Sequence, residues 1–473
     1  MLELIRKYQR INYSKIFIAF IMILTPLGIG AQNISQVDRI HGISKFWQES
    51  NYNFAYFENI PNKDFDSLYK HYLKEIIDEE NDYKYYRKLQ KFCAELKDGH
   101  TQVFMPDYLR KEIFYPPIRI RRIKDKVYII NVGKSYVEKI PRGSRILKVE
   151  GMDVLDYLRQ KVYPYISAAE HIVKSRGAKI MLEGLINTDV DITIKKPNGG
   201  TKKIAVHRDG KSEKWYYPVD KARGSEIVEF KQLENKIGYI ALNSFAHKEV
   251  VEKFKELLPK LYKQKAIIID LRNNGGGNSG YAHRITKYFT DKSYFLGEVG
   301  STRKHIATYK AWGALADSNY ADLIGMKIPS ETMKNNTKYL KYYHNNAWKK
   351  EDPDSIKNDV EAEKLLMPLV ILTSNSTASA AEDFLVGMEY LNRATIIGQK
   401  TNGSTGQPIY FSLPECGLFR ICTRKCTYPD GKKFVGTGII PDIEVKPTLD
   451  YYLSGEGTVL DKAAKYLEKI IKR

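Results

Sequence analysis

Two uncharged, β-branched runs constrain the fold of this chain more than any other feature, because each is followed by a turn and a helical pattern. Ala266–Leu271 is apolar until Asp270 and leads into a glycine-rich turn. Leu369–Leu372 leads into the octapeptide Asn375–Glu382 and then into apolar residues at helical spacing. Uncharged runs of this kind are typical of buried strands. The succession of strand, turn and helix predicts an α/β domain from about residue 225.

The octapeptide places Ser379 at the end of a buried strand and the start of a helix. There a hydroxyl is exposed beside free backbone N–H groups and the positive end of the helix dipole. Such a site can stabilise negative charge on an acyl oxygen, so Ser379 is a candidate nucleophile. However, Ser379 and Glu382 also fit a capping box, which would only close the helix start. The octapeptide alone leaves both interpretations open.

A histidine and a glycine-rich turn are further candidates. The pattern predicts helices from 38 to about 98, ending at the C-cap signal Lys97–Gly99, and His100 follows directly. A histidine in this position is often only a surface residue or a local cap. The turn 272–278 contains three glycines, which let the backbone approach a ligand and offer N–H groups. It lacks the Gly-Lys-Ser/Thr pattern of a phosphate loop.

Residues 115 to about 208 form a small, mostly β module with a hairpin turn signal at 197–201. Its segment Gly143–Val154 resembles the signature of PDZ domains. That resemblance implies that an extended peptide adds as a strand and that its terminal carboxylate is captured. Gly143 and Gly151 flank a strand that we expect beside the peptide groove. The alternative is a β module that only packs against its neighbour.

The amino terminus and the composition indicate an exported protein. Residues 1–31 contain a basic leader, a nine-residue apolar run and a plausible cleavage site, which predicts a signal peptide, with an amino-terminal anchor as the alternative. The formal charge is +20, but the basic residues are scattered without a block of five, which does not favour nucleic acid. Export permits a disulfide, expected within Cys416, Cys422 and Cys426. No zinc spacing is evident, so no metal site is predicted.

An insertion at 300–365 places tyrosines and tryptophans among lysines. This pattern can bind single-stranded nucleic acid. In an exported protein it favours a lid or wall over the active site.

Five short motifs occur in the order seen in the serine peptidases related to carboxyl-terminal processing protease and tricorn protease, and the chain resembles that family over roughly 95–105 and 225–450. The motifs are Asp98–Thr101, Asp270–Gly277, Thr377–Glu382, Gly398–Gly403 and Gly438–Asp442. The resemblance implies a crotonase-like catalytic domain that needs no cofactor.

The family pattern also implies roles for individual residues. Ser379 would be the nucleophile, and the backbone N–H groups of Ala380 and Gly276 would form the oxyanion hole. Carboxyl-terminal processing proteases use a lysine base at the position that is Ser404 here, while Lys400 lies at a different motif position. Tricorn-like members use a histidine base instead, which would be His100, whose imidazole titrates near working pH.

Two departures concern the groups that orient the base. Tricorn-like members have a serine just before the histidine, where this chain has Gly99. They also have a glutamate at the position that aligns with Val435. Ser404 is therefore a further site candidate, placed to contact the base or the water.

Together these patterns predict an α/β protein with a crotonase-like catalytic domain, an inserted PDZ-like module and a helical amino-terminal segment. The expected function is an exported, periplasmic or extracellular serine endopeptidase. Its expected partner is a peptide or unfolded protein held by its free carboxyl terminus, with no nucleic acid and no membrane span after signal removal. The alternative is a peptide- or apolar-ligand-binding protein without hydrolysis. The expected divisions are a signal peptide at 1–31, a helical region at 32–110, a PDZ-like domain at 111–210 and a catalytic domain at 220–473.

Overall fold

The computed structural model describes residues 34–61, 64–217, 226–454 and 459–472. The signal peptide expected at 1–31 lies outside these residues. Within the described ranges, no helix is long and apolar enough to cross a membrane.

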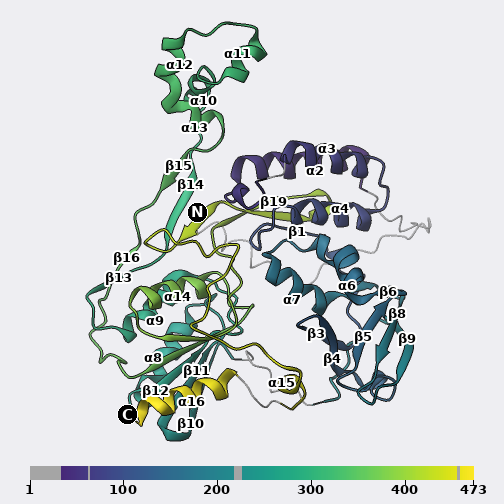
Figure 1. The fold of residues 1–473 in the computed structure, drawn as a ribbon, viewed down its shortest axis with the longest axis vertical. Helices are drawn as coiled ribbons and strands as arrows, with labels where there is room; N and C mark the ends of the chain where they lie inside the picture. Colours follow the sequence, from purple (N-terminus) through teal and green to yellow (C-terminus); the bar gives the residue numbers. More distant parts are fainter. Residues whose placement is uncertain (1–33, 62–63, 218–225, 455–458, 473) are drawn as a thin grey trace, which may run out of the picture. The chain divides into compact units, whose positions relative to one another are not determined.

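A six-stranded sheet forms the centre of the carboxyl-terminal half (Figure 1). The outer strand β10 is antiparallel to β11, and all the other neighbouring strands are parallel. In sheet order the strands are β10 (Val228–Leu233), β11 (Ile237–Leu242), β12 (Ala266–Asp270), β17 (Leu369–Thr373), β18 (Thr395–Gly398) and β22 (Ile443–Glu444). The two uncharged runs that predicted an α/β domain are β12 and β17, the central strands, which are buried throughout.

Helices cover both faces of this sheet, which makes the mixed α/β class plain. Side chains alternate between two cores, with Ile267 and Ile269 in one and Ile268 in the other. The first core is covered by α8 (Glu249–Leu261), α9 (Ser279–Thr286) and α14 (Ala380–Tyr390), and the second by α16 (Val459–Ile471). Because strands of this sheet are buried on both faces, they read as continuous apolar runs in the sequence.

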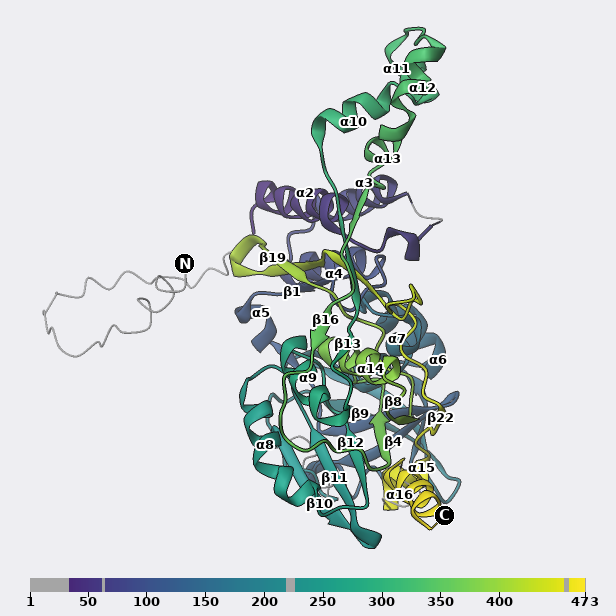
Figure 2. The same cartoon turned by 90° about the vertical axis from the view of Figure 1, so that its left-hand side faces the viewer.

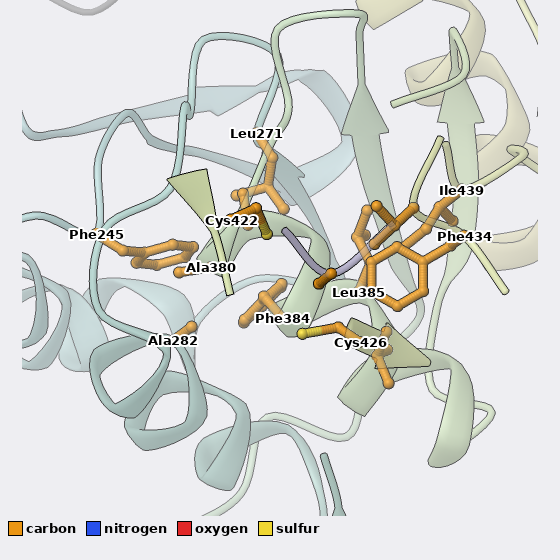
Figure 3. Close-up of a cluster of buried hydrophobic side chains, with 14 of the residues drawn as sticks. Phe245, Leu271, Ala282, Ala380, Phe384, Leu385, Cys422, Cys426, Phe434 and Ile439 are labelled. Atoms are coloured by element: carbon orange, nitrogen blue, oxygen red, sulfur yellow. The ribbon is translucent and has the colours of Figure 1, made fainter. Parts of the chain in front are cut away.

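The first turns of α14 are surrounded by apolar side chains (Figure 3). Every residue from Ala380 to Met388 is buried. Phe384 and Leu385 belong to the same core as Phe245 from the β11–α8 connection and Phe434 from the carboxyl-terminal loops. This packing fixes the residue that precedes the helix from several sides.

The amino-terminal region is helical and then joins a small sheet. Its helices are α2 (Gln36–Asn53), α3 (Phe65–Ile76), α4 (Asp82–Ala94) and the short α5 (Asp107–Lys111). Between α4 and α5, β1 (Gln102–Phe104) pairs antiparallel with β20 (Leu418–Cys422), which also pairs with β19 (Pro408–Ser412). The Phe46 ring of α2 contacts Phe92 of α4 at 5.1 Å and Phe419 of β20 at 5.4 Å. The segment that follows α4 is thereby held against the carboxyl-terminal part of the chain.

The β module is a sheet in the order β3–β4–β5–β8–β9 with a helix beside its first strand. These elements are β3 (Ile118–Ile123), β4 (Lys126–Val132), β5 (Arg145–Val149), β8 (Asp189–Lys195), β9 (Thr201–His207) and α7 (Glu170–Ile180). The remaining elements of this region are β2 (Ile113–Phe114), β6 (Met152–Asp153), α6 (Val154–Tyr157) and β7 (Gly184–Leu185).

One expectation for this module is wrong. The strand between Gly143 and Gly151 is β5, and both of its edges are hydrogen-bonded, to β4 and to β8. No peptide can therefore add beside it. Among the described residues β3 pairs only with β4, so β3 is one of the two edge strands of this sheet, with β9 at the other edge, and α7 packs against β3.

The insertion forms a helical arm beyond a β ribbon (Figures 1 and 2). The ribbon strands are β13 (Tyr294–Leu296), β14 (Val299–Arg303), β15 (Trp348–Lys350), β16 (Ser355–Lys357) and β21 (Arg424–Thr427), and the arm helices are α10 (Ala307–Ala314), α11 (Ser318–Ile324), α12 (Ser330–Asn336) and α13 (Leu340–Tyr343). Its aromatic rings stack on one another: Tyr309 contacts Trp312, Tyr339 and Tyr342 at 4.8–5.5 Å. The aromatics thus pack on one another within the arm, with Trp312 still exposed, and the lid over the active site stays a prediction.

The disulfide expected among the last three cysteines is absent, because all four cysteines are free. Cys416 is exposed, whereas Cys422 and Cys426 are buried on different strands. The Cys422 thiol lies near the Arg424 carbonyl at 3.5 Å, and that of Cys426 lies near the Arg424 guanidinium at 3.7 Å. Each thiol therefore has a polar neighbour instead of a sulfur partner.

Candidate functional site

Ser379 is the N-cap of α14, after the turn that follows β17. Its φ of 54° and ψ of −129° are sparsely populated for a residue with a side chain, and such a conformation costs about 1–3 kcal/mol. Its N–H donates to the Ser404 carbonyl at 2.9 Å, and its own carbonyl accepts from the Glu382 N–H at 2.6 Å. The surrounding contacts therefore hold the serine in a strained position.

The capping box is present, so that interpretation of Ser379 and Glu382 is confirmed. The Glu382 carboxylate accepts the Ser379 N–H at 3.3 Å. An ordinary N-cap has an extended backbone, whereas Ser379 has a positive φ. Capping therefore describes where the serine lies without excluding a chemical role.

Glu382 makes more contacts than a cap requires. Its carboxylate also accepts the hydroxyl of Thr401 and the backbone N–H groups of Gly403 at 2.8 Å and Ser404 at 2.9 Å. The side chain is fully buried, and burial raises its pKa to about 7 although all four donors favour the ionised form. Glu382 thus joins the start of α14 to the loop 401–404.

His100 contacts the same loop through Ser404. Its Nδ1 is 2.5 Å from the Ser404 hydroxyl oxygen, a contact between residues 304 positions apart. Burial lowers the pKa of His100 below its ordinary value of 6.5, and Arg420 lowers it further while Asp98 raises it. A lowered pKa keeps the imidazole neutral near neutral pH, which is the form that accepts a proton.

Gly99 and Ser404 fit each other. A Cβ atom at Gly99 would lie 2.7 Å from the Ser404 hydroxyl oxygen and 3.1 Å from its Cβ. A serine at 99 would therefore clash with Ser404 in its present place. The hydroxyl that is absent at 99 is therefore supplied by Ser404, which contacts His100.

The two expected oxyanion donors lie together but differ in availability. A Cβ atom at Gly276 would be 2.5 Å from the Ser379 Cβ and 2.9 Å from the Ala380 nitrogen, so the glycine turn lies against Ser379 and the start of α14. The Ala380 N–H is in the first turn of α14, where N–H groups have no partner within the helix. In contrast, the Gly276 N–H donates to the Asn274 side chain at 2.8 Å.

The remaining sequence candidates are not joined to Ser379. Among the described residues, no hydrogen bond links Ser379 to His100, and neither a hydrogen bond nor an ion pair links it to the half-buried Lys400. Val435 is buried in the apolar core beneath the loop and supplies no polar group there.

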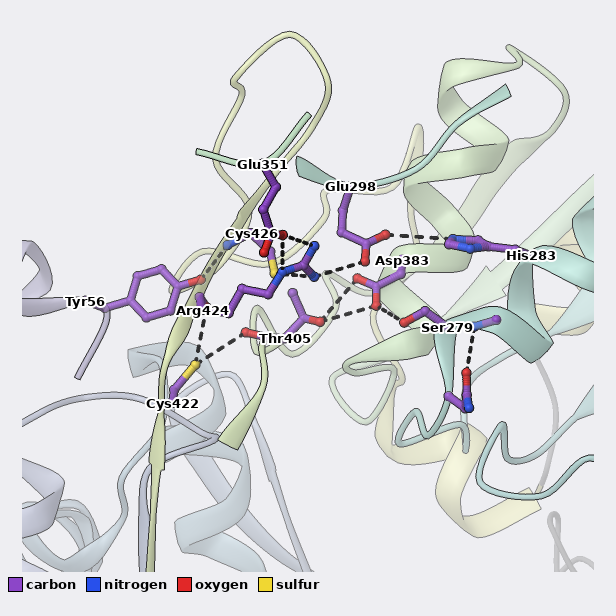
Figure 4. A network of polar contacts seen from close by, with 12 residues as sticks. Tyr56, Ser279, His283, Glu298, Glu351, Asp383, Thr405, Cys422, Arg424 and Cys426 are labelled. Atoms are coloured by element: carbon purple, nitrogen blue, oxygen red, sulfur yellow. Dashed lines mark hydrogen bonds and ion pairs between the residues drawn. The ribbon is translucent and has the colours of Figure 1, made fainter. Parts of the chain in front are cut away.

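A second buried carboxylate supports the same helix start (Figure 4). Asp383 accepts hydroxyl hydrogen bonds from Ser279 at the start of α9 and from Thr405, at 2.6 Å and 3.2 Å. Burial raises its pKa well above the usual range, and the nearby Glu298 raises it further. Glu298 in turn contacts Arg424 at 3.3 Å. The helix start, the glycine turn and the 404–405 loop are thus fixed by one polar network.

Glu382 is the residue whose importance the sequence analysis missed, because it was interpreted only as a cap. One signal was available: apart from Asp383, its neighbours in the helix are apolar, and a buried carboxylate needs several donors. No group of three or more His, Cys, Asp or Glu side chains within the described ranges is arranged to hold a metal ion.

Comparison with known proteins points to one peptidase family. Residues 236–445 match the sequence model described as Peptidase family S41, so this segment is similar to that family. The recognition made from the five motifs is therefore confirmed.

Curated relatives of this chain agree. It is 26% identical over 307 residues to a carboxy-terminal-processing protease of Bartonella bacilliformis, covering 63% of this chain and 58% of the relative. It is 26% identical over 289 residues to a probable CtpA-like serine protease of Staphylococcus haemolyticus, covering 58% and 47%. The matches span about half the length of these relatives.

Solved structures show the same fold at low sequence identity. Mature CPAF complexed with lactacystin superposes with a TM-score of 0.66 at 16% identity, over 92% of this chain and 98% of that chain. A putative peptidase from Parabacteroides merdae superposes with a TM-score of 0.50 at 18% identity, over 92% and 97%. The fold therefore extends over nearly the whole length, well beyond the segment that the family model matches.

Proposed function

We propose that this protein is a serine endopeptidase that hydrolyses peptide bonds through an acyl-enzyme on Ser379, with His100 as the general base. One observation carries the proposal: the Glu382 carboxylate binds the N–H groups of both Ser379 and Ser404, and Ser404 contacts His100. Nucleophile, base and the residue that positions the base are thereby joined through one buried anchor.

In this proposal the two ring nitrogens of His100 have different roles. If Nδ1 carries the hydrogen and donates it to the Ser404 hydroxyl, Nε2 is left unprotonated. Nε2 would take the Ser379 proton as the hydroxyl attacks the scissile carbonyl, and then give it to the leaving amine. In the second step, Nε2 takes a proton from the water that attacks the acyl-enzyme and returns it to the Ser379 oxygen as the acyl group leaves. Ser404 is a positioning residue in this scheme.

The oxyanion hole would use the Ala380 N–H first. It lies at a helix start, where the partial positive charge favours an anion. The Gly276 N–H has the right neighbourhood, but it is engaged by Asn274. It can contribute only by sharing its hydrogen with the oxyanion or after the Asn274 amide moves.

The architecture fits this proposal. The six-stranded sheet, with α14 after the turn that follows β17, would be the crotonase-like core. The sheet from β3 to β9 with α7 would be the PDZ-like module. The edge of β3 beside α7, which pairs with no strand among the described residues, suits an added peptide strand whose free carboxyl terminus is held by backbone donors. A peptidase with a cleaved leader at 1–31 would act in the periplasm or outside the cell.

A fluorophosphonate probe tests the proposal directly, since it labels only an activated serine. Labelling of the wild-type protein at Ser379, and its loss in Ser379→Ala, is the expected result. A folded wild-type protein that stays unlabelled would favour the second candidate function, a peptide-binding protein. That alternative rests on the missing hydrogen bond between His100 and Ser379 and on the apolar Val435.

A further inference from the structure

A cavity of about 1010 Å³ lies between the β module and the turns at the carboxyl ends of β12 and β17. Its module side is formed by β3, β4 and α7, and its other side includes Arg272 and the turn 374–376. The turn 374–376 leads to Ser379 within a few residues. Clefts at the carboxyl ends of parallel strands are where ligands bind in open α/β sheets.

This cavity is strongly basic. Eight lysine or arginine residues line it, against a single carboxylate, Asp125. Four of the eight have carboxylate partners: Arg122 pairs with Asp125, Arg272 with Asp270, Lys174 with Glu170 and Lys446 with Glu444. Within the described ranges, the other four have no carboxylate partner: Arg121, Lys124, Lys126 and Lys179.

Those four cations come from the strand pair β3–β4 and from α7, the elements that border the edge of the module. Desolvation, together with the nearby guanidinium groups of Arg121 and Arg176, lowers the pKa of Lys179 to about 8. Lys179 is exposed when the whole residue is considered, so the lowered pKa reflects the crowded surroundings of its ammonium group. An anion in the cavity would relieve the repulsion among these cations.

The cavity wall is also tied to the active-site loop. His171 of α7 lines the cavity, and its Nε2 lies 2.7 Å from the Thr401 carbonyl oxygen. The Thr401 hydroxyl donates to Glu382. A chain segment in the cavity would therefore lie against the same loops that hold Ser379 and His100.

We propose that this cavity is a subsite for an acidic segment of the peptide substrate, with aspartate or glutamate side chains several residues from the scissile bond. The proposal rests on the peptidase function proposed above. A peptide is the occupant because the cavity adjoins the edge of β3, whose unpaired backbone groups can bind an extended chain. The four cations that have no carboxylate partner among the described residues select acidic side chains.

The test uses the full-length Ser379→Ala protein, so that binding is measured without hydrolysis. The probes are a fluorescent peptide containing a short run of glutamates and its glutamine counterpart, compared by anisotropy at low and at physiological ionic strength. Several partly exposed ion pairs acting together should favour the acidic peptide about tenfold, less at the higher salt. Failure of this preference is distinct from failure of the peptidase proposal, which fluorophosphonate labelling of the wild type decides.

Charge reversal locates the site. Lys126→Glu combined with Lys179→Glu should abolish the preference, whereas Lys202→Glu should retain it. Lys202 is the matched control, because it is an exposed strand lysine of the same sheet that does not line the cavity. Equal binding of the two peptides, or equal effects of cavity and control variants, would overturn the proposal. Displacement of the acidic peptide by a lower concentration of an oligonucleotide of similar charge would also overturn it and assign the cavity to nucleic acid.

Discussion

The starts of α9 and α14 follow neighbouring parallel strands of one sheet, yet their caps differ. Asn278 caps α9 with an ordinary extended backbone, φ −103° and ψ 116°, and its side chain accepts the Gly280 N–H at 2.8 Å. Ser379 caps α14 with a positive φ, and its N–H is satisfied by Glu382 and by the Ser404 carbonyl. At α9 the Asn278 side chain accepts a hydrogen bond from its own helix, whereas at α14 the buried Glu382 accepts a hydrogen bond from the N-cap residue itself.

The difference between the two caps lies in what holds the N-cap residue in place. At α9 the sequence needs only a local acceptor for the helix N–H groups. At α14 the strain of Ser379 is sustained by residues from the loop 401–404 and by the core of Figure 3. Strained backbone persists where the surrounding structure over-determines it, and such positions cluster at functional sites.

The largest expected contrast is between removing the two caps. Ser379→Ala should lower peptide hydrolysis by about a millionfold, with a loss of unfolding free energy of about 0.5–2 kcal/mol. Asn278→Ala should cost a similar free energy and leave hydrolysis within about tenfold. Steady-state kinetics and urea unfolding measure both. Full activity in Ser379→Ala with only a modest loss of stability would leave capping as the serine's sole role.

The choice of base gives the next largest effect. His100→Ala should lower kcat by about a hundredfold to ten-thousandfold, because a positioned general base contributes that much. Lys400→Ala should change kcat far less, since no contact joins Lys400 to Ser379 among the described residues. The opposite ranking in turnover assays would restore a lysine base in a shifted position.

Glu382 and Asp383 allow a sharper comparison within one helix start. Glu382→Gln should lose about 1–3 kcal/mol of unfolding free energy, because an amide N–H₂ would face backbone N–H groups that cannot become acceptors. Asp383→Asn should cost less, since the hydroxyls of Ser279 and Thr405 can rotate to accept. Urea unfolding of the two variants tests the difference, and equal losses would contradict the anchoring role of Glu382.

The pH profile depends on the lowered pKa of His100. The base works only when it is neutral. The rate should therefore rise as the pH increases through the pKa of His100, and it should fall when the pH drops below that pKa and the imidazole is protonated. Burial places that pKa below 6.5, so the acid limb of kcat/KM should lie below pH 6.5. The profile of Lys400→Ala should keep the same limb. An acid limb well above pH 7 would indicate another base.

The smallest effect concerns the β module. In the full-length Ser379→Ala protein, peptides with a free, apolar carboxyl terminus should bind several-fold more tightly than their amidated forms, because amidation removes the charge that backbone donors hold. Competition binding measures the ratio. Equal affinities would leave the module as a spacer or a gate.

The sequence by itself determined the class of the fold and the position of the candidate nucleophile. The runs that became β12 and β17 could be recognised because a strand buried on both faces must be apolar along its length. Ser379 could be located because a strand–turn–helix order places one residue at the helix start. His100 and Ser404 were named from motif positions, and their contact could not be derived from spacing.

Only the tertiary structure decided which groups meet. The contact of His100 with Ser404, and the clash that makes Gly99 the residue that fits beside Ser404, join parts of the chain that the pairing of β1 with β20 brings together. The tertiary structure also decided that β3 is an edge strand of its sheet and that the cysteines are free. Local sequence fixes periodicity and turns, whereas long-range packing fixes neighbours, and the site of this protein is made almost entirely of such neighbours.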